Sequence, residues 1–278
     1  MVRTLDNQGG LLLKLKFTTK IYLFLNLLLT LLRTLQILFL TEPGTAFLKG
    51  GHAFLNWTGS IIVVLVMLYL AANSYLALRQ PTKVGSIGVP GFVLYALSAA
   101  LFAIGGAATF VGKPHFWAVV AVAAPLAAFA CALFAAGEIA EYEFPRPASL
   151  IFIACVLCEM LAAYKFYTEH PLRVRTVFEV FAICGSLLFF VVFGKTLCGV
   201  RPERSFRFLY PLGLISSTLC FASVVPETLA RIFGKGANVS ASCISQFLLL
   251  GAGLFMATVT LATFRRQNTK RPQRPAEQ

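Results

Sequence analysis

Residues 148–168 read ASLIFIACVLCEMLAAYKFYT, an apolar stretch with Glu159 near its middle. It is long enough to cross a bilayer as a helix, which takes roughly 20 apolar residues. A carboxylate at that depth is costly in hydrocarbon, so it requires a partner, a proton or a path for water. Arg33 is the other charge that lies equally deep in a strongly apolar stretch. The segment therefore predicts a membrane-spanning helix and raises the question of whether Glu159 and Arg33 meet.

The composition of the whole chain points to the same class of protein. Its 278 residues are 58% hydrophobic and only 13% charged, and the mean hydropathy is +0.79. Soluble domains carry roughly 25% charged residues. A water-soluble fold of this length has no means of covering so much apolar surface. We therefore expect an all-α, polytopic integral membrane protein.

Further apolar runs, each near the length of a membrane span, occur on both sides of residues 148–168. They cover residues 21–41, 54–78, 87–111, 115–137, 176–197, 206–225 and 242–264. The connectors are short, so consecutive helices are expected to pack as antiparallel neighbours. The sequence thus predicts a bundle of about eight transmembrane helices in one transmembrane domain over residues 1–278. Residues 1–19 are expected to form a basic interfacial lead-in, and residues 265–278 a basic disordered tail.

The net charge of +13 comes from Lys and Arg residues that lie between and beyond the apolar runs. Placing the N-terminus inside puts most of these residues on the inner side, as the positive-inside rule requires. Both termini are therefore predicted to be cytoplasmic, where the basic residues would contact anionic lipid headgroups. This distribution argues against nucleic acid as a partner. Short loops and a basic tail favour a cell membrane of the bacterial inner type.

One face of the first apolar run is polar. Asn26, Thr30 and Arg33 follow i, i+4, i+7 spacing and share a helix face, with Gln36 somewhat off it. At a rise of about 1.5 Å per residue, Arg33 and Glu159 differ in depth by only a few Å. We therefore predict an intramembrane pair of Arg33 with Glu159, with Asn26, Thr30 and Gln36 as polar lining.

This predicted pair has more than one interpretation. It either fixes the register of two helices or forms a gated charge or proton-linked site. A third possibility is that Arg33 extends towards the membrane surface while Glu159 is protonated.

The cysteines and histidines predict neither a cofactor nor a metal site. Seven cysteines are spread through the apolar runs and are expected to be small buried residues without disulfides. Cys155 and Cys158 have CxxC spacing, but they lie inside an apolar helix that supplies no further ligands. His52, His115 and His170 fall in predicted outer loops and lack the local partners typical of metal sites.

The third and fourth runs, residues 87–111 and 115–137, are rich in alanine and glycine, and Pro125 interrupts the fourth. Small residues let helix backbones approach closely, so we expect these two helices at the buried centre of the bundle. Glu138 follows the fourth run and is expected in a solvated acidic loop, or as part of a cation-attracting surface. Proline-containing inner connectors, at Pro81, Pro147 and Pro202, suggest a repeated helical hairpin.

Motifs for catalysis are absent from the sequence. There is no phosphate-binding glycine loop, no nucleophile elbow and no HExxH helix, so we expect that the protein is not an enzyme. Three function classes remain. Arg33, Glu159 and Pro125 favour a small-solute or ion transporter or permease. The alternatives are a non-catalytic accessory or scaffold subunit and a membrane-embedded sensor.

Overall fold

The computed structural model describes residues 20–21, 23–40, 53–77, 87–112, 118–140, 150–158, 174–200, 202–233 and 242–269. Within these ranges the chain is almost entirely helical and contains no strand. The predicted all-α architecture is therefore confirmed.

The helices follow the apolar runs closely. The first helix is described over residues 20–21 and 23–35 and continues into a π-helix, η1 (Gln36–Leu40). A further helix is described over residues 150–158. The remaining helices are α2 (Ala53–Ala77), α3 (Val89–Gly112), α4 (Ala118–Ala140), α6 (Val174–Leu197), α7 (Pro202–Ile232) and α8 (Ser242–Thr269).

Six helical segments in the described ranges are long and apolar enough to cross a membrane. They are Leu23–Leu40, Val89–Ala107, Val122–Ile139, Phe178–Leu197, Arg204–Ala230 and Gln246–Thr263. Helix α2 has a shorter apolar part, Trp57–Ala72.

The outer surface of the bundle carries many large apolar side chains that are exposed. Leu27 and Leu31 on the first helix are 67% and 53% exposed, and Phe129 on α4 is 60% exposed. Soluble monomers rarely expose large contiguous apolar patches. These side chains therefore face lipid, and the protein is membrane-embedded.

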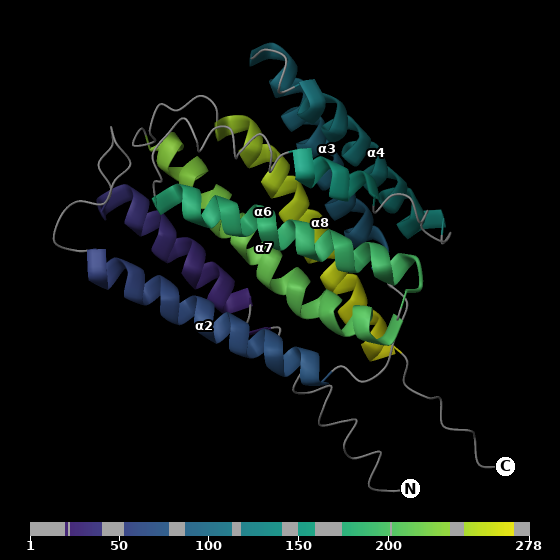
Figure 1. Ribbon diagram of the computed structural model, residues 1–278, viewed down its shortest axis with the longest axis horizontal. Coiled ribbons are helices and arrows are strands. Elements are labelled where there is room, and N and C mark those ends of the chain that lie inside the picture. Colours follow the sequence, from purple (N-terminus) through teal and green to yellow (C-terminus); the bar gives the residue numbers. More distant parts are fainter. Residues whose placement is uncertain are drawn as a thin grey trace, which may run out of the picture.

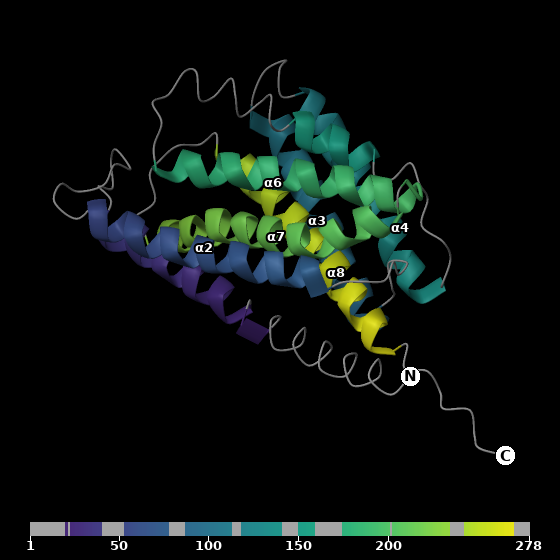
Figure 2. The same cartoon turned by 60° about the horizontal axis from the view of Figure 1, so that its bottom comes forward.

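Helices α7 and α8 form the centre of the bundle (Figure 1). Helix α6 packs on α7, α3 packs on α8, α4 packs on α3, and α2 packs on α7. The first helix and α2 lie side by side along one flank in both views (Figures 1 and 2). The first helix also packs against α7 through Leu29, which contacts the cluster containing Tyr210 and Leu214.

The expectation that the third and fourth spans form the buried centre is wrong. Buried residues make up 67% of the span in α7 and 72% of the span in α8, compared with 33% in α3 and 50% in α4. The small residues of α3 and α4 instead bring these two helices against each other. A Cβ on Gly106 of α3 would lie 3.0 Å from Pro125 Cδ of α4. This close contact leaves the outer face of the hairpin towards lipid.

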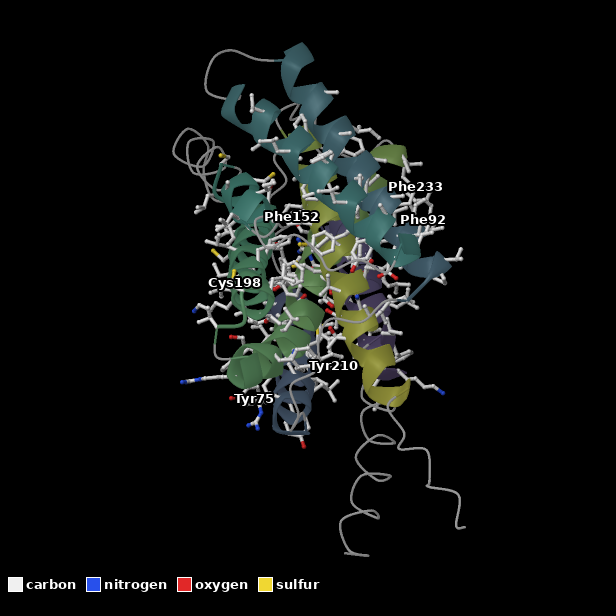
Figure 3. The ribbon with its side chains drawn as sticks, turned by 90° about the vertical axis from the view of Figure 1, so that its right-hand side faces the viewer. Tyr75, Phe92, Phe152, Cys198, Tyr210 and Phe233 are labelled. Atoms are coloured by element: carbon white, nitrogen blue, oxygen red, sulfur yellow. The ribbon has the colours of Figure 1, made fainter. Side chains whose placement is uncertain are left out.

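Aromatic rings fill the middle of the bundle. Phe152 of the 150–158 helix stacks on Phe190 of α6 at a centroid distance of 4.9 Å and lies 4.5 Å from Phe255 of α8. Phe134 of α4 meets Phe255 edge-on at 5.2 Å. Figure 3 shows Phe152 inside the bundle, whereas Phe92 and Phe233 lie at its periphery. We refer to Phe134, Phe152, Phe190 and Phe255 as the aromatic core.

None of the six cysteines whose side chains are described forms a disulfide. Cys131, Cys155 and Cys220 are buried, as expected. Cys184 and Cys198 are exposed, so the expectation of burial is wrong for these two. Cys184 lies on the outer face of α6, and Cys198 lies in the turn that follows this helix.

Candidate functional site

Arg33 is buried in the first helix, with only 3% of its side chain exposed. Its Nη1 donates a hydrogen bond to Gln36 Oε1 at 2.9 Å. Its Cζ lies 4.1 Å from the ring centroid of Phe178 on α6, which is a cation–π contact. Its Nε has no hydrogen-bond partner among the described residues. The ring therefore covers a face of the guanidinium, and one N–H on its edge has no acceptor in the part of the chain that the structure describes.

Gln36 connects Arg33 to α2. Its Nε2 donates to Ser60 Oγ at 3.0 Å, and both side chains are buried. Gln36 is the first residue of η1, where the first helix changes from α to π geometry. Such wider turns are frequent at functional sites. The structure therefore brings Gln36 together with Arg33, although helical spacing alone placed it off the polar face.

Glu227 of α7 and Gln246 of α8 form the second half of the site. Gln246 Nε2 donates to Glu227 Oε2, and both side chains are 8% exposed. The negative charge of Glu227 also acts on Arg33. Glu227 follows Pro226, which lacks an N–H and leaves the carbonyl four residues earlier without its usual helical donor. We name Arg33, Gln36, Ser60, Glu227 and Gln246 the polar cluster.

The polar cluster lies near the end of the bundle at which η1 and α7 end and α8 begins. Gln36 is just before the end of the first apolar segment, and Glu227 is five residues before the end of α7 at Ile232. Gln246 is four residues after the start of α8 at Ser242. The cluster is therefore buried one or two helical turns below the helix ends, at the opposite end of the bundle from the aromatic residue Tyr75.

The structure gives less support to a role in the site for the other residues that the sequence predicts there. Asn26 and Thr30 are half-buried on the first helix, and the carbonyl of Thr30 accepts a hydrogen bond from Thr34 Oγ1 at 2.8 Å. Glu159 lies outside the described residues. The pairing of Arg33 with Glu159 therefore stays a prediction.

Sequence reasoning missed Glu227 because it ended the seventh span at Val225 and left Glu227 in a loop. In the structure α7 continues to Ile232 despite Pro226. The apolar residues Leu229, Ala230 and Ile232 carry the signal of this continuation. Gln246 and Ser60 were missed because a single neutral polar residue in an apolar run is not distinctive.

The opposite end of the bundle also contains a buried carboxylate. Glu138 of α4 is 4% exposed, and its Oε2 accepts hydrogen bonds from the N–H groups of Ile87 at 2.6 Å and Gly88 at 2.8 Å. These amides lie at the start of α3, where the helix dipole favours a negative charge. The expectation of a solvated loop position for Glu138 is therefore wrong. Glu138 is the N-terminal cap of α3, supplied by α4.

Glycine makes this cap possible at two positions. Gly88 has a φ of +76°, a conformation that residues with a Cβ adopt rarely. A Cβ on Gly91 would lie 2.8 Å from Glu138 Cδ. The carboxylate thus occupies space that any other residue at position 91 would fill.

No group of three or more His, Cys, Asp or Glu residues that could hold a metal occurs among the described residues. The three histidines considered from the sequence lie outside these residues.

Comparison of the chain with known proteins finds no matching family model, no matching curated protein and no matching solved structure. The class of the protein therefore follows from its own features. It is a helical membrane protein in which charged and amide side chains from separate helices meet in a buried cluster.

Proposed function

We propose that the protein is a transporter or permease for a small solute or ion, and that the polar cluster is its binding site. The observation that carries this proposal is that Arg33 and Glu227, on different helices, are both buried and interact through their charges. Ionisable side chains inside membrane proteins are costly and typically mark substrate or ion pathways. The neutral polar side chains around them offer further donors and acceptors to a solute.

The proposal includes eight membrane spans. Helix α2 has 25 residues, which corresponds to roughly 38 Å at 1.5 Å per residue and exceeds the bilayer core. The described 150–158 helix begins the apolar run 148–168 and would supply the remaining span. An even number of spans places both termini on one side.

We propose that this side is the cytoplasm of a bacterium and that the membrane is its plasma membrane. Lys195 and Arg204 are exposed at the end of the bundle remote from the polar cluster. Basic residues favour the cytoplasmic side and anionic headgroups. A reporter fused after Gln278 should therefore give a cytoplasmic signal, and an external signal would contradict the eight-span topology.

We also propose that the protein has no catalytic activity of its own. The hydroxyl of the polar cluster, Ser60 Oγ, accepts a hydrogen bond from Gln36 and has no base beside it among the described side chains. The cluster thus supplies charge and hydrogen bonds but lacks the pairing of nucleophile and base that hydrolytic enzymes use.

A second candidate function is that of a non-catalytic accessory or scaffold subunit. The aromatic core favours it, because stacked and edge-on rings between α4, α6 and α8 fill the middle of the bundle. In this case the polar cluster would only fix the positions of the first helix, α7 and α8.

A stability screen of the purified protein separates the two candidates. A solute at a hundred times its dissociation constant adds about 2.7 kcal/mol to the free energy of unfolding. Stabilising solutes are then tested for uptake by proteoliposomes containing the wild type or R33Q. We expect uptake by the wild type and its loss in R33Q, while E138Q, at the other end of the bundle, retains it. No stabilising solute and no uptake would favour the scaffold.

A further inference from the structure

The edge of the Arg33 guanidinium points to the chemical class of the solute. Nη1 is occupied by Gln36 and a face is covered by Phe178, whereas Nε lacks an acceptor among the described residues. The Nε edge of arginine can present two parallel N–H donors, a geometry that matches the two oxygens of a carboxylate. A buried cationic donor without an acceptor is unfavourable, so an incoming acceptor would be bound strongly.

The charge of the polar cluster restricts how such an anion is bound. Arg33 and Glu227 together are neutral, and Gln36, Ser60 and Gln246 add no charge. A monovalent anion at Arg33 would leave the buried cluster with a net negative charge, which a low-dielectric environment strongly disfavours. A proton on Glu227 removes this excess charge.

We propose that the polar cluster binds a small monovalent carboxylate at the Nε edge of Arg33 together with one proton on Glu227. The proton comes from solution and is held on the Glu227 carboxyl group, beside the amide of Gln246. The cluster with its bound anion and proton is then neutral, as it is when empty. This inference rests on the proposed transport function and specifies its substrate as an acid carried in the form of an anion and a proton.

Among the side chains that the structure describes, the helices around Glu227 contribute few other charges. The first helix supplies Arg33, while α2 and α8 supply the neutral Ser60 and Gln246. On α6, Glu179 adjoins Phe178 and is half-buried. Among the described side chains at this end of the bundle, Glu179 is the other titratable group, so it provides the control.

The test measures the thermal stability of the full-length protein in detergent with sodium acetate, between pH 5.5 and pH 8. Sodium chloride and acetamide serve as reference solutes. We expect acetate to stabilise the wild type, with the apparent affinity falling towards tenfold per pH unit at the upper end. Equal stabilisation by chloride would overturn the carboxylate class, and stabilisation by acetamide would overturn the requirement for an anion.

Variants test separately whether the anion binds at Arg33 and whether the proton binds at Glu227. E227Q should bind acetate with an affinity that no longer depends on pH and that exceeds the wild-type affinity at least tenfold at pH 8. R33K keeps the charge but loses the two-donor edge, and it should lose at least tenfold in affinity at every pH. E179Q should retain the wild-type pH profile. A pH dependence that survives in E227Q, or that disappears in E179Q, would overturn the proposal.

The predicted pairing with Glu159 is the competing explanation for how the buried charge of Arg33 is balanced. If the Glu159 carboxylate were the acceptor of Arg33 Nε, acetate would stabilise E159Q but not the wild type, which would overturn the proposal. Uptake of labelled acetate by proteoliposomes then tests transport separately. Proton-linked binding of acetate without uptake would support the carboxylate site and contradict the transport function. Uptake of a solute other than a carboxylate would support the transport function and contradict the carboxylate site.

Discussion

Glu138 and Glu227 are buried glutamates at opposite ends of the same bundle, and their surroundings differ in kind. Glu138 accepts hydrogen bonds from the backbone N–H groups of Ile87 and Gly88, directly before α3. Glu227 meets side chains instead, the amide of Gln246 and the charge of Arg33. A carboxylate held by backbone amides has one arrangement. A carboxylate held by side chains from other helices can exchange partners or take a proton, so burial alone does not distinguish a structural acid from a functional one.

The largest loss of stability is expected when the charge of Arg33, at the Glu227 end of the bundle, is removed. R33L removes the buried positive charge that interacts with Glu227, and removal of one partner of a buried charge pair typically costs about 3–5 kcal/mol. Thermal or denaturant unfolding in detergent measures this loss. Replacing both residues, as in R33L/E227M, should recover much of it.

The double variant R33L/E159M tests the pairing predicted from the sequence. Recovery of stability in R33L/E159M but not in R33L/E227M would identify Glu159 as the partner of Arg33. Losses that simply add in both double variants would show that neither Glu227 nor Glu159 is the charge partner of Arg33.

Removal of the Glu138 carboxylate is expected to cost less stability than removal of the Arg33 charge. E138A removes the acceptor of the Ile87 and Gly88 amides, and lost hydrogen bonds to a charged group typically cost about 1.5–3 kcal/mol. E138Q keeps a side-chain oxygen in place and should lose less than half of that amount. Hydrogen exchange at Gly88 would report the opened helix start. Equal stability of E138A and the wild type would show that water caps α3 just as well.

Adding a methyl group beside Glu138 tests how tightly the cap is held. G91A places a Cβ 2.8 Å from Glu138 Cδ, so the carboxylate must shift, and we expect a loss of roughly 1–2 kcal/mol, as for other overpacked sites. G59A is the matched control, because no atom lies within 4 Å of a Cβ added there. G59A should be neutral or stabilising by up to about 1 kcal/mol, since alanine favours helix. A loss in G59A equal to that in G91A would remove steric contact as the cause.

The smallest loss of stability is expected from replacing Ser60 of the polar cluster. S60A removes the acceptor of Gln36 Nε2, and a neutral hydrogen bond contributes about 0.5–1.5 kcal/mol. A double-mutant cycle of S60A with Q36L should give a coupling energy in this range. Zero coupling would indicate that Gln36 is positioned by Arg33 alone.

Much of the fold could be predicted from the sequence, because each helix coincides with an apolar run. The burial of Arg33 was also predictable, since its position deep in the first run leaves it few exposed alternatives. The centre of the bundle was not. Small residues indicate that two helices approach closely, but they do not tell which pair lies in the middle. Gly106 brings α3 to α4 at the edge of the bundle, while α7, with Pro211 and Pro226, occupies the centre.

The candidate site was predictable only on the first helix. Arg33 and Gln36 share one short segment, so their spacing carries information about contact. Glu227 lies almost two hundred residues later, and only the packing of the first helix against α7 brings its charge near Arg33. Glu138 was misplaced for a related reason. The donors to its carboxylate are the backbone N–H groups of Ile87 and Gly88, which have no signature in the sequence.

The cap at Glu138 has a consequence for the biosynthesis of the protein. The Ile87 amide is synthesised 51 residues before the carboxylate that it will meet. Backbone groups without a partner do not remain in hydrocarbon, so the start of α3 stays with interfacial water until α4 has crossed the bilayer. Helices α3 and α4 therefore complete their insertion as a hairpin, and a nascent chain that ends before residue 138 leaves this step unfinished.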